Sequence, residues 1–248
     1  MENVIETFNK YLFVLAHPDD EVYCCVLIKR LIDLKKDVTA IYLTSGDSGT
    51  NPSARLEELK KSMSLIGINE KNFLLLGVKE SELFDKLDEI AMRAKKVGDE
   101  YLPDCVIGMD YEGGHEGHDV ASLFGYLASR QADCKYYTFP VYHADKGKRI
   151  AAIMVPGRDA DFTLTLDSNE KDLKINIFEA HKGQIGHFLG LQKNNPEYFK
   201  LMLTREIYRD ADKIDYTLPP STEIGYESHR NGFKYSDFNS AVLAILKR

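Results

Sequence analysis

Short apolar runs alternate with longer amphipathic stretches along the first 140 residues of the chain. Three runs are continuously apolar, which is typical of strands covered on both faces of a parallel sheet: residues 11–15, 72–76 and 105–109. Two further strands are predicted over residues 37–43 and 135–141. Helical spacing of apolar residues predicts helices over residues 21–35, 53–66, 83–97 and 120–132. This alternation predicts an α/β fold that is Rossmann-like and doubly wound, with a mostly parallel sheet and helices on both faces.

The pattern changes after about residue 145. Two strands joined by the turn Pro156–Asp159 are predicted, followed by a helix, a weak strand, a long loop and a final helix that has Ser236 as its N-cap; they cover residues 149–155, 161–166, 174–188, 205–214, 215–234 and 236–246. The sequence contains no repeat and no low-complexity linker. We therefore expect a single domain over residues 1–248, with a Rossmann-like core over 1–145 and a C-terminal elaboration over 146–248.

Composition excludes several classes of partner. The chain has 248 residues, of which 44% are hydrophobic, so it can bury a sizeable core. Its net charge of -7 disfavours binding to nucleic acid or to an anionic membrane, since both need a basic face. Apolar runs stay below 18 residues, so we expect no membrane span. The four cysteines form no CxxC pair, and we expect buried free thiols in a cytoplasmic protein.

Acids and a histidine crowd the turn after the first predicted strand. Residues 16–22 read Ala-His-Pro-Asp-Asp-Glu-Val, which places His17, Asp19, Asp20 and Glu21 between a strand and a helix. Ligands bind at the carboxyl ends of strands in open α/β sheets. Because clustered carboxylates repel one another unless a cation lies among them, a metal site is the first hypothesis.

A second cluster occupies the equivalent position after the fourth predicted strand. Residues 110–119 contain His115 and His118, preceded by the glycine pair Gly113 and Gly114. Both loops can open onto the same crevice, so the candidate metal ligands are His17, Asp20, His115 and His118. Two histidines and one carboxylate, with water in the fourth position, form a catalytic zinc site. Iron, cobalt or manganese could occupy the same donor set. Asp19 is then a spare carboxylate that can take a proton from the water.

Each motif alone has a plainer interpretation. Most pairs of histidines three residues apart are structural or lie on the surface. A single acid in the first turn can simply cap the following helix. Capping does not need three successive acids, however, and the two motifs follow two separate predicted strands. Their joint occurrence favours the metal site.

These residues carry a family resemblance. The stretch Ala16–Glu21 resembles the AHPDDE motif of the LmbE-like, or PIG-L, family of zinc-dependent N-deacetylases, which remove acetyl groups from N-acetylglucosamine units and related amides. Further likeness extends over roughly residues 10–190. The other matching elements are Gly114–His118, which resembles GHxDH, and Thr44–Asp47, Arg55 with Glu58, and Ala180–Gln184.

The resemblance implies a role for each matching residue. It implies Asp19 as the general base, and His115 as the residue that steadies the oxyanion and protonates the leaving amine. Arg55 matches an arginine that contacts substrate, and Glu21 is expected to orient a ligand. The implied zinc ligands are His17, Asp20 and His118.

The chain departs from the family pattern at two positions. Gly117 stands where GHxDH has an aspartate, an acid that would help to orient a neighbouring histidine. Glu116 and Asp119 are the adjacent acids that could take over this task. Gly183 likewise replaces the serine of a later AHxSQ element.

The sequence thus predicts a zinc-dependent hydrolase that removes an acetyl or other acyl group from the amide nitrogen of an N-acetylglucosamine-like substrate. Its expected partner is a small N-acyl sugar or glycoconjugate, and the resemblance also implies a homo-oligomer. The main alternative is a non-catalytic protein of the same fold that binds metal or carbohydrate, with Gly117 marking lost catalysis. A nucleotide-dependent enzyme is disfavoured because the first loop offers acids rather than G-x-G-x-x-G.

Overall fold

The computed structural model describes residues 4–47, 51–212, 214–229 and 232–247. Its main sheet has seven strands in the order β3-β2-β1-β4-β5-β9-β8. The first five are parallel, and β9 and β8 are added antiparallel to their neighbours. Their bounds are Lys10–Leu15 (β1), Asp37–Thr44 (β2), Phe73–Val78 (β3), Cys105–Met109 (β4), Lys135–Phe139 (β5), Phe162–Thr165 (β8) and Arg205–Asp210 (β9). The predicted mostly parallel sheet is confirmed.

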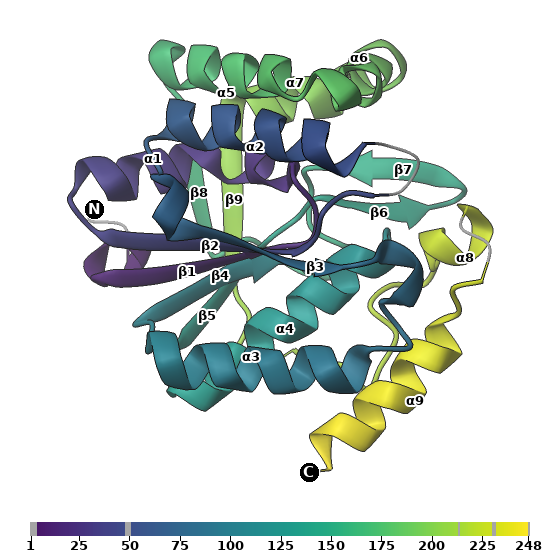
Figure 1. Cartoon of the computed structure of the whole chain (residues 1–248). Helices are drawn as coiled ribbons and strands as arrows, with labels where there is room; N and C mark the ends of the chain where they lie inside the picture. The colour runs from purple at the N-terminus through teal and green to yellow at the C-terminus, as the bar shows by residue number, and fades with distance from the viewer. Residues whose placement is uncertain (1–3, 48–50, 213, 230–231, 248) are drawn as a thin grey trace.

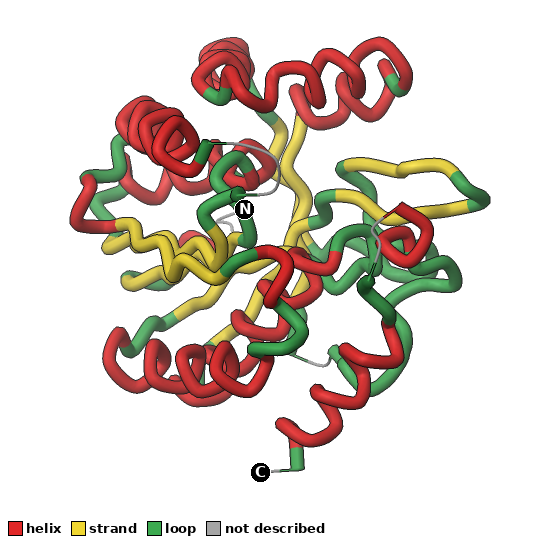
Figure 2. The backbone as a smooth tube through the Cα atoms, turned by 45° about the vertical axis from the view of Figure 1, so that its right-hand side comes forward, coloured by secondary structure: helices red, strands yellow, loops and turns green. Residues whose placement is uncertain are grey.

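Helices cover both faces of this sheet, which confirms the doubly wound fold (Figure 1). The helices α3 (Leu87–Tyr101) and α4 (Glu116–Ala132) pack together on one face. The opposite face carries α1 (Cys25–Asp33) and α2 (Pro52–Ile66), against which α5 (Ser168–Ala180) packs as an outer layer. Figure 2 shows these helical layers on either side of the strands. No described helix is long and apolar enough to cross a membrane.

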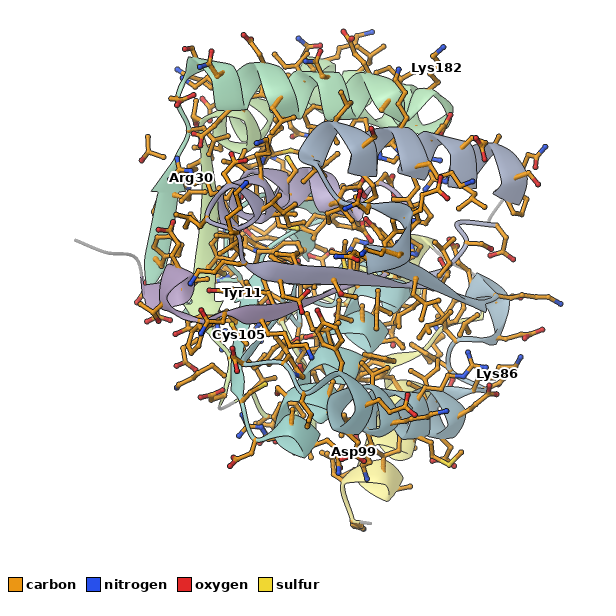
Figure 3. All side chains as sticks on the ribbon, turned by 60° about the vertical axis from the view of Figure 1, so that its left-hand side comes forward. Tyr11, Arg30, Lys86, Asp99, Cys105 and Lys182 are labelled. Carbon is orange, nitrogen blue, oxygen red and sulfur yellow. The ribbon has the colours of Figure 1, made fainter. Side chains whose placement is uncertain are left out.

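Position in the sheet decides how deeply each apolar run is buried. The central strands β1 and β4 are buried except for Lys10, and Tyr11 lies beside Cys105 in register (both labelled in Figure 3). The sequence predicted that the apolar run over residues 72–76 is buried on both faces, and this prediction is wrong. Strand β3 forms an edge of the sheet, and Leu74 on it is 51% exposed. Cys24, Cys25 and Cys105 are buried free thiols, whereas Cys134 is half-buried.

The second half departs most from the sequence prediction. The two strands predicted as a pair belong to different sheets, because β7 (Lys148–Ala151) forms a hairpin with β6 (Tyr142–Asp145), while β8 pairs with β9. The predicted helix over 174–188 is also wrong. Helix α5 starts at Ser168 and ends at Ala180, and α6 (Ile185–Asn194) and α7 (Pro196–Thr204) follow it.

The predicted long loop over 215–234 contains a short helix, α8 (Gly225–His229). The last helix, α9, runs over Tyr235–Leu246. Ser236 is not its N-cap, since the helix begins one residue earlier with Lys234 at the cap position. At the start of helix α5, Asp167 and Glu170 form a reciprocal capping box, in which each side chain accepts the backbone N–H of the other residue.

One end of the C-terminal elaboration is tied to the core by an arginine. Arg30 of α1 donates from Nε and Nη2 to the Glu170 carboxylate of α5, at 2.6 and 2.9 Å, and from Nη2 to the carbonyl of Thr165 in β8. Figure 3 shows Arg30 beside this edge of the sheet. A fork of this kind fixes orientation as well as contributing energy.

Candidate metal centre and cavity

The strand order reverses between β1 and β4, which is where ligands bind in doubly wound sheets. The loop after β1 carries His17, Asp19 and Asp20. After β4, His115 is the N-cap of α4, and His118 lies in its first turn. Helix α4 therefore begins at Glu116, four residues before the predicted start at residue 120, and its first turn contains part of the second motif. The fold brings both motifs to the same crevice.

The Asp20 carboxylate lies between two imidazoles. Its Oδ2 is 3.3 Å from Nδ1 of His17, and its Oδ1 is 3.5 Å from Nε2 of His118. Two ligands of a tetrahedral ion with bonds of about 2.0–2.2 Å lie about 3.3–3.6 Å apart. Oδ2 also accepts the backbone N–H groups of Ala16 and His17, which fix the side chain. Each of these two pairs has the spacing of two ligands on one tetrahedral cation.

His115 joins this group. Ring nitrogens of His17, His115 and His118 all lie within 4.8 Å of one another, so a three-histidine set is also open to a metal. The His115 ring stacks on His118 with centroids 4.8 Å apart. Its Nδ1, however, accepts the backbone N–H of Gly117 at 3.0 Å. This hydrogen bond occupies one of its nitrogens, whereas Asp20 contacts both other histidines directly.

Burial and charge oppose each other in this cluster. Burial by itself lowers the pKa of His17, but the carboxylate of Asp20 and then that of Glu80 outweigh it and raise the pKa to about 9. Burial likewise raises the pKa of Asp20, yet the two histidines hold it well below its usual range. Asp20 is therefore an anion at neutral pH, as a metal ligand must be.

Asp19 adopts a backbone conformation that is rare for a residue with a side chain. Its φ is 138°, in a region that costs of order 1–3 kcal/mol and persists only where the surroundings impose it. The backbone N–H donates to Oε2 of Glu21, and the side-chain Oδ1 accepts from Nη2 of Arg55 at 3.0 Å. Burial raises the pKa of Asp19 to about 6, against the opposing effect of Arg55.

Arg55 is buried, lines the cavity, and has two guanidinium donors that no described residue accepts from. Its guanidinium is packed against Gly46, where a Cβ would lie 2.8 Å from Nε and where φ is +65°. Among the described residues, Nε and Nη1 of Arg55 have no hydrogen-bond partner. Buried donors of this kind normally have a partner, so these are free to bind a ligand.

Glu21 stabilises the turn through contacts of its buried carboxylate. Its fully buried carboxylate accepts hydrogen bonds from Ser62, Tyr42 and the Asp19 backbone, and contacts Nε2 of His181. Burial raises its pKa, but the His181 imidazole and Ser62 outweigh this and lower it. Glu21 thus supports the strained turn and pairs with His181, rather than with the candidate ligands His17 or His118.

The neighbourhood of Gly117 explains why this position has no side chain. A Cβ there would lie 2.8 Å from Nε2 of His17 and 3.3 Å from Nδ1 of His115. The two acids that the sequence offered as substitutes differ in what they contact. Glu116 places Oε2 3.4 Å from Nδ1 of His115, whereas Asp119 accepts the backbone N–H groups of the preceding loop.

One acid of the site escaped the sequence analysis. Glu80, in the loop after β3, is buried and places Oε1 3.5 Å from Nε2 of His17. With His115 and Glu116 it forms a second group of potential metal ligands. A single glutamate in a polar loop has no distinguishing pattern, and only its place after the next parallel strand could have pointed to it.

One end of a cavity of about 800 Å³ is lined by the residues His17, Asp19, Asp20, Arg55, Glu80, His115 and His118. The outer wall comes from the β6–β7 hairpin, from α6 and from α8. Figure 1 shows these elements together at the side of the molecule where the parallel strands end. The C-terminal elaboration therefore supplies most of the outer wall. The outer lining residues include Tyr142, Lys148, Arg149, Gln184, Phe188, Leu191, Asn194, Asn195 and Tyr226.

Comparison with known proteins found a family match for the half of the chain that carries the two motifs. The family model PIG-L, GlcNAc-PI de-N-acetylase, matches residues 12–129. The matched segment resembles this family and carries both sequence motifs. No protein with curated function matches its sequence. Two groups of described residues have ligand atoms close enough together to hold a metal: His17, His115 and His118, and Glu80, His115 and Glu116.

Several solved structures share the fold of this chain. N,N'-diacetylchitobiose deacetylase from Pyrococcus horikoshii is 17% identical, with 94% of this chain and 90% of that one covered and a TM-score of 0.62. A zinc-inhibited form of teicoplanin deacetylase is 12% identical over 82% of this chain and 100% of that one, with a TM-score of 0.58. A 4-carboxy-2-hydroxymuconate hydratase from Pseudomonas putida KT2440 is 13% identical over 83% and 98%, with a TM-score of 0.51. At these identities the likeness shows the fold alone.

Proposed function

We propose that this protein is a zinc-dependent hydrolase that removes an acetyl group from the amide nitrogen of an N-acetylglucosamine-like sugar. The observation that carries the proposal is the Asp20 carboxylate between His17 and His118, with Asp19 and His115 beside them at the end of a large cavity. The family-model match over residues 12–129 and the deacetylases of the same fold support it. The hydratase of the same fold means that the site, not the fold, decides the chemistry.

The donor set suits zinc. His17, Asp20 and His118 offer two nitrogens and one carboxylate, and each nitrogen lies at ligand spacing from one Asp20 oxygen. A tetrahedral ion held by these three residues would keep one position open for water. Other divalent transition metals accept the same donors. When bound, the metal would polarise the amide carbonyl and acidify its water.

Two residues handle protons in this proposal. Asp19 accepts the proton of the attacking water, and the Arg55 guanidinium holds the Asp19 carboxylate in place through Oδ1. His115 acts at the other side of the amide. Because its Nδ1 accepts the Gly117 N–H, the proton of the neutral ring lies on Nε2, which can donate to the oxyanion or to the leaving nitrogen.

The remaining donors of Arg55, Nε and Nη1, bind the sugar in this proposal. The expected partner is a small N-acyl sugar or glycoconjugate. A cytoplasmic location, a homo-oligomeric state and the organisation as one domain stay predictions.

The test is release of acetate from a panel of N-acetylated sugars. Purified protein, metal-stripped protein and stripped protein reloaded with zinc are assayed side by side. We expect activity in the first and third samples only. Stoichiometric zinc without release of any acyl group would instead identify a non-catalytic metal- or carbohydrate-binding protein.

A further inference from the structure

The two ring nitrogens of His17 lie beside two different carboxylates. Asp20 makes its closest contact at Nδ1, 3.3 Å from Oδ2, and Glu80 makes its closest contact at Nε2, 3.5 Å from Oε1. Among the described residues, no hydrogen bond reaches the buried Nε2. Since buried ring nitrogens normally have a hydrogen-bond partner, Glu80 is the candidate for that partner.

The position of the proton on His17 follows from the nitrogen that faces the metal site. In a neutral imidazole one nitrogen carries the proton, and the other is free to bind a metal. Because Nδ1 lies beside Asp20, it is the nitrogen placed to be the ligand atom, and the proton then lies on Nε2. A histidine that binds a metal almost always donates its other N–H to a carboxylate, a carbonyl or water. Glu80 Oε1 lies about 0.3 Å beyond the usual limit of such a hydrogen bond, so a small rotation of the ring or carboxylate completes it.

Glu80 is held in place by its own segment of the chain. It opens the short 3₁₀ helix Glu80–Glu82 after β3, and its backbone N–H donates to Oδ1 of Asp47 at 3.3 Å. Its side chain is only 9% exposed, and a carboxylate so deeply buried is costly unless donors or cations face it. The His17 ring therefore lies between two carboxylates that come from different loops, one after β1 and one after β3.

Two other roles are open to Glu80. It lines the cavity, where it could contact substrate, and it groups with His115 and Glu116 as potential ligands of a further ion. Neither role gives Nε2 of His17 a partner. A substrate contact would also leave metal affinity in the absence of substrate unchanged, whereas a further ion would change the number of ions bound per chain.

We propose that Glu80 is a positioning residue, which accepts the Nε2–H of His17 and so fixes the tautomer and the orientation of this metal ligand. The inference rests on the metal site of the proposed function and adds a residue that acts on that site through His17. A partner of this kind typically contributes 10- to 100-fold to metal affinity.

The test measures zinc affinity without substrate, by competition with a chelating dye. Glu80→Ala should weaken zinc binding about 10- to 100-fold. Glu80→Asp keeps the charge but withdraws the carboxylate by one methylene, and it should show a similar loss. Glu80→Gln keeps an acceptor oxygen at the same reach and should recover part of the affinity. Glu82→Gln is the matched control, because Glu82 lies in the same short helix, pairs with Lys79 and Lys86, and does not line the cavity.

Cobalt-substituted protein reports the hydrogen bond itself. The exchangeable ring N–H of a histidine bound to Co²⁺ gives a strongly shifted proton resonance, and a hydrogen bond protects it from exchange with water. We expect the resonance of His17, assigned by its absence in His17→Ala, to disappear in Glu80→Ala and Glu80→Asp and to persist in Glu82→Gln.

Unchanged zinc affinity in both Glu80→Ala and Glu80→Asp, or a His17 resonance that survives in them, would overturn the inference. A rise in KM alone would make Glu80 a substrate contact, and a second zinc per chain that Glu80→Ala removes would make it a ligand; either result overturns the positioning role. None of these binding readouts needs turnover. Absence of acetate release would therefore refute the proposed function and leave this inference to be decided by zinc affinity and the cobalt spectrum.

Discussion

A single methyl group added at Gly117 should weaken metal binding at the proposed site. A Cβ there would lie 2.8 Å from Nε2 and 2.9 Å from Cε1 of His17, closer than real Cβ contacts allow. Ordinary contact begins near 3.4 Å, so the imidazole must move by about 0.6 Å. Metal bonds to nitrogen are only about 2.0–2.1 Å long, and a shift of this size misplaces the ligand.

We therefore expect Gly117→Ala to weaken zinc binding about 10- to 100-fold, which corresponds to roughly 1.4–2.8 kcal/mol. Deacetylase activity at limiting zinc should fall with it. The fold itself should not suffer, because alanine is favoured over glycine within a helix by about 1 kcal/mol. Zinc affinity is measured by competition with a chelating dye, and the thermal midpoint reports folding.

Gly186→Ala is the control for this experiment. Gly186 lies in α6, and a Cβ there would meet nothing within 4 Å. The control should keep the wild-type zinc affinity. Wild-type zinc affinity and turnover in Gly117→Ala would refute the argument that His17 is held against this glycine as a ligand.

Three further outcomes follow from contacts already described. Asp19→Asn should lower kcat about 10²–10⁴-fold while bound zinc, counted by elemental analysis, stays stoichiometric; an unchanged kcat would remove Asp19 as the base. Arg30 lowers the pKa of Glu170 through a hydrogen bond, so their pairing stabilises the fold above the usual glutamate pKa and is lost as pH falls. Glu170→Gln should thus cost about 1 kcal/mol in urea unfolding at pH 7 and nearly nothing at pH 3, and a pH-independent deficit would contradict this. Lys174→Met leaves the buried carboxylate of Glu206, which lies 2.8 Å from Nζ of Lys174, without its cation. The free energy of unfolding should fall by about 3–5 kcal/mol, and the added substitution Glu206→Gln should recover part of that loss.

The inner half of the site could be predicted from sequence because its pattern is local. His17 and Asp20 follow the buried strand β1, and His115 and His118 lie at the start of the helix after the buried strand β4. The parallel sheet brings the ends of these two strands together. Their roles as ligands and catalytic groups stay proposals. The deduction needed only the order of elements and not the details of packing.

The outer half could not be predicted in the same way. Strands β6 and β7 are four residues each, too short for a reliable alternation of apolar and polar positions. In the two-residue turn between them, Lys146 and Gly147 both have positive φ, and in the sequence only Gly147 marks this turn. The end of α5 at Ala180 carried no breaker residue. It follows from tertiary structure, since His181 turns inward to contact Glu21.

The contact between Glu21 and His181 joins positions 160 residues apart in the chain. The same carboxylate holds the backbone of Asp19, so the conformation of the reactive turn depends on a side chain contributed from far downstream. Transplanting the N-terminal portion alone into another scaffold would relax the turn, however faithfully its own residues were kept. A chimaera would have to bring a histidine back to the same position beside Glu21.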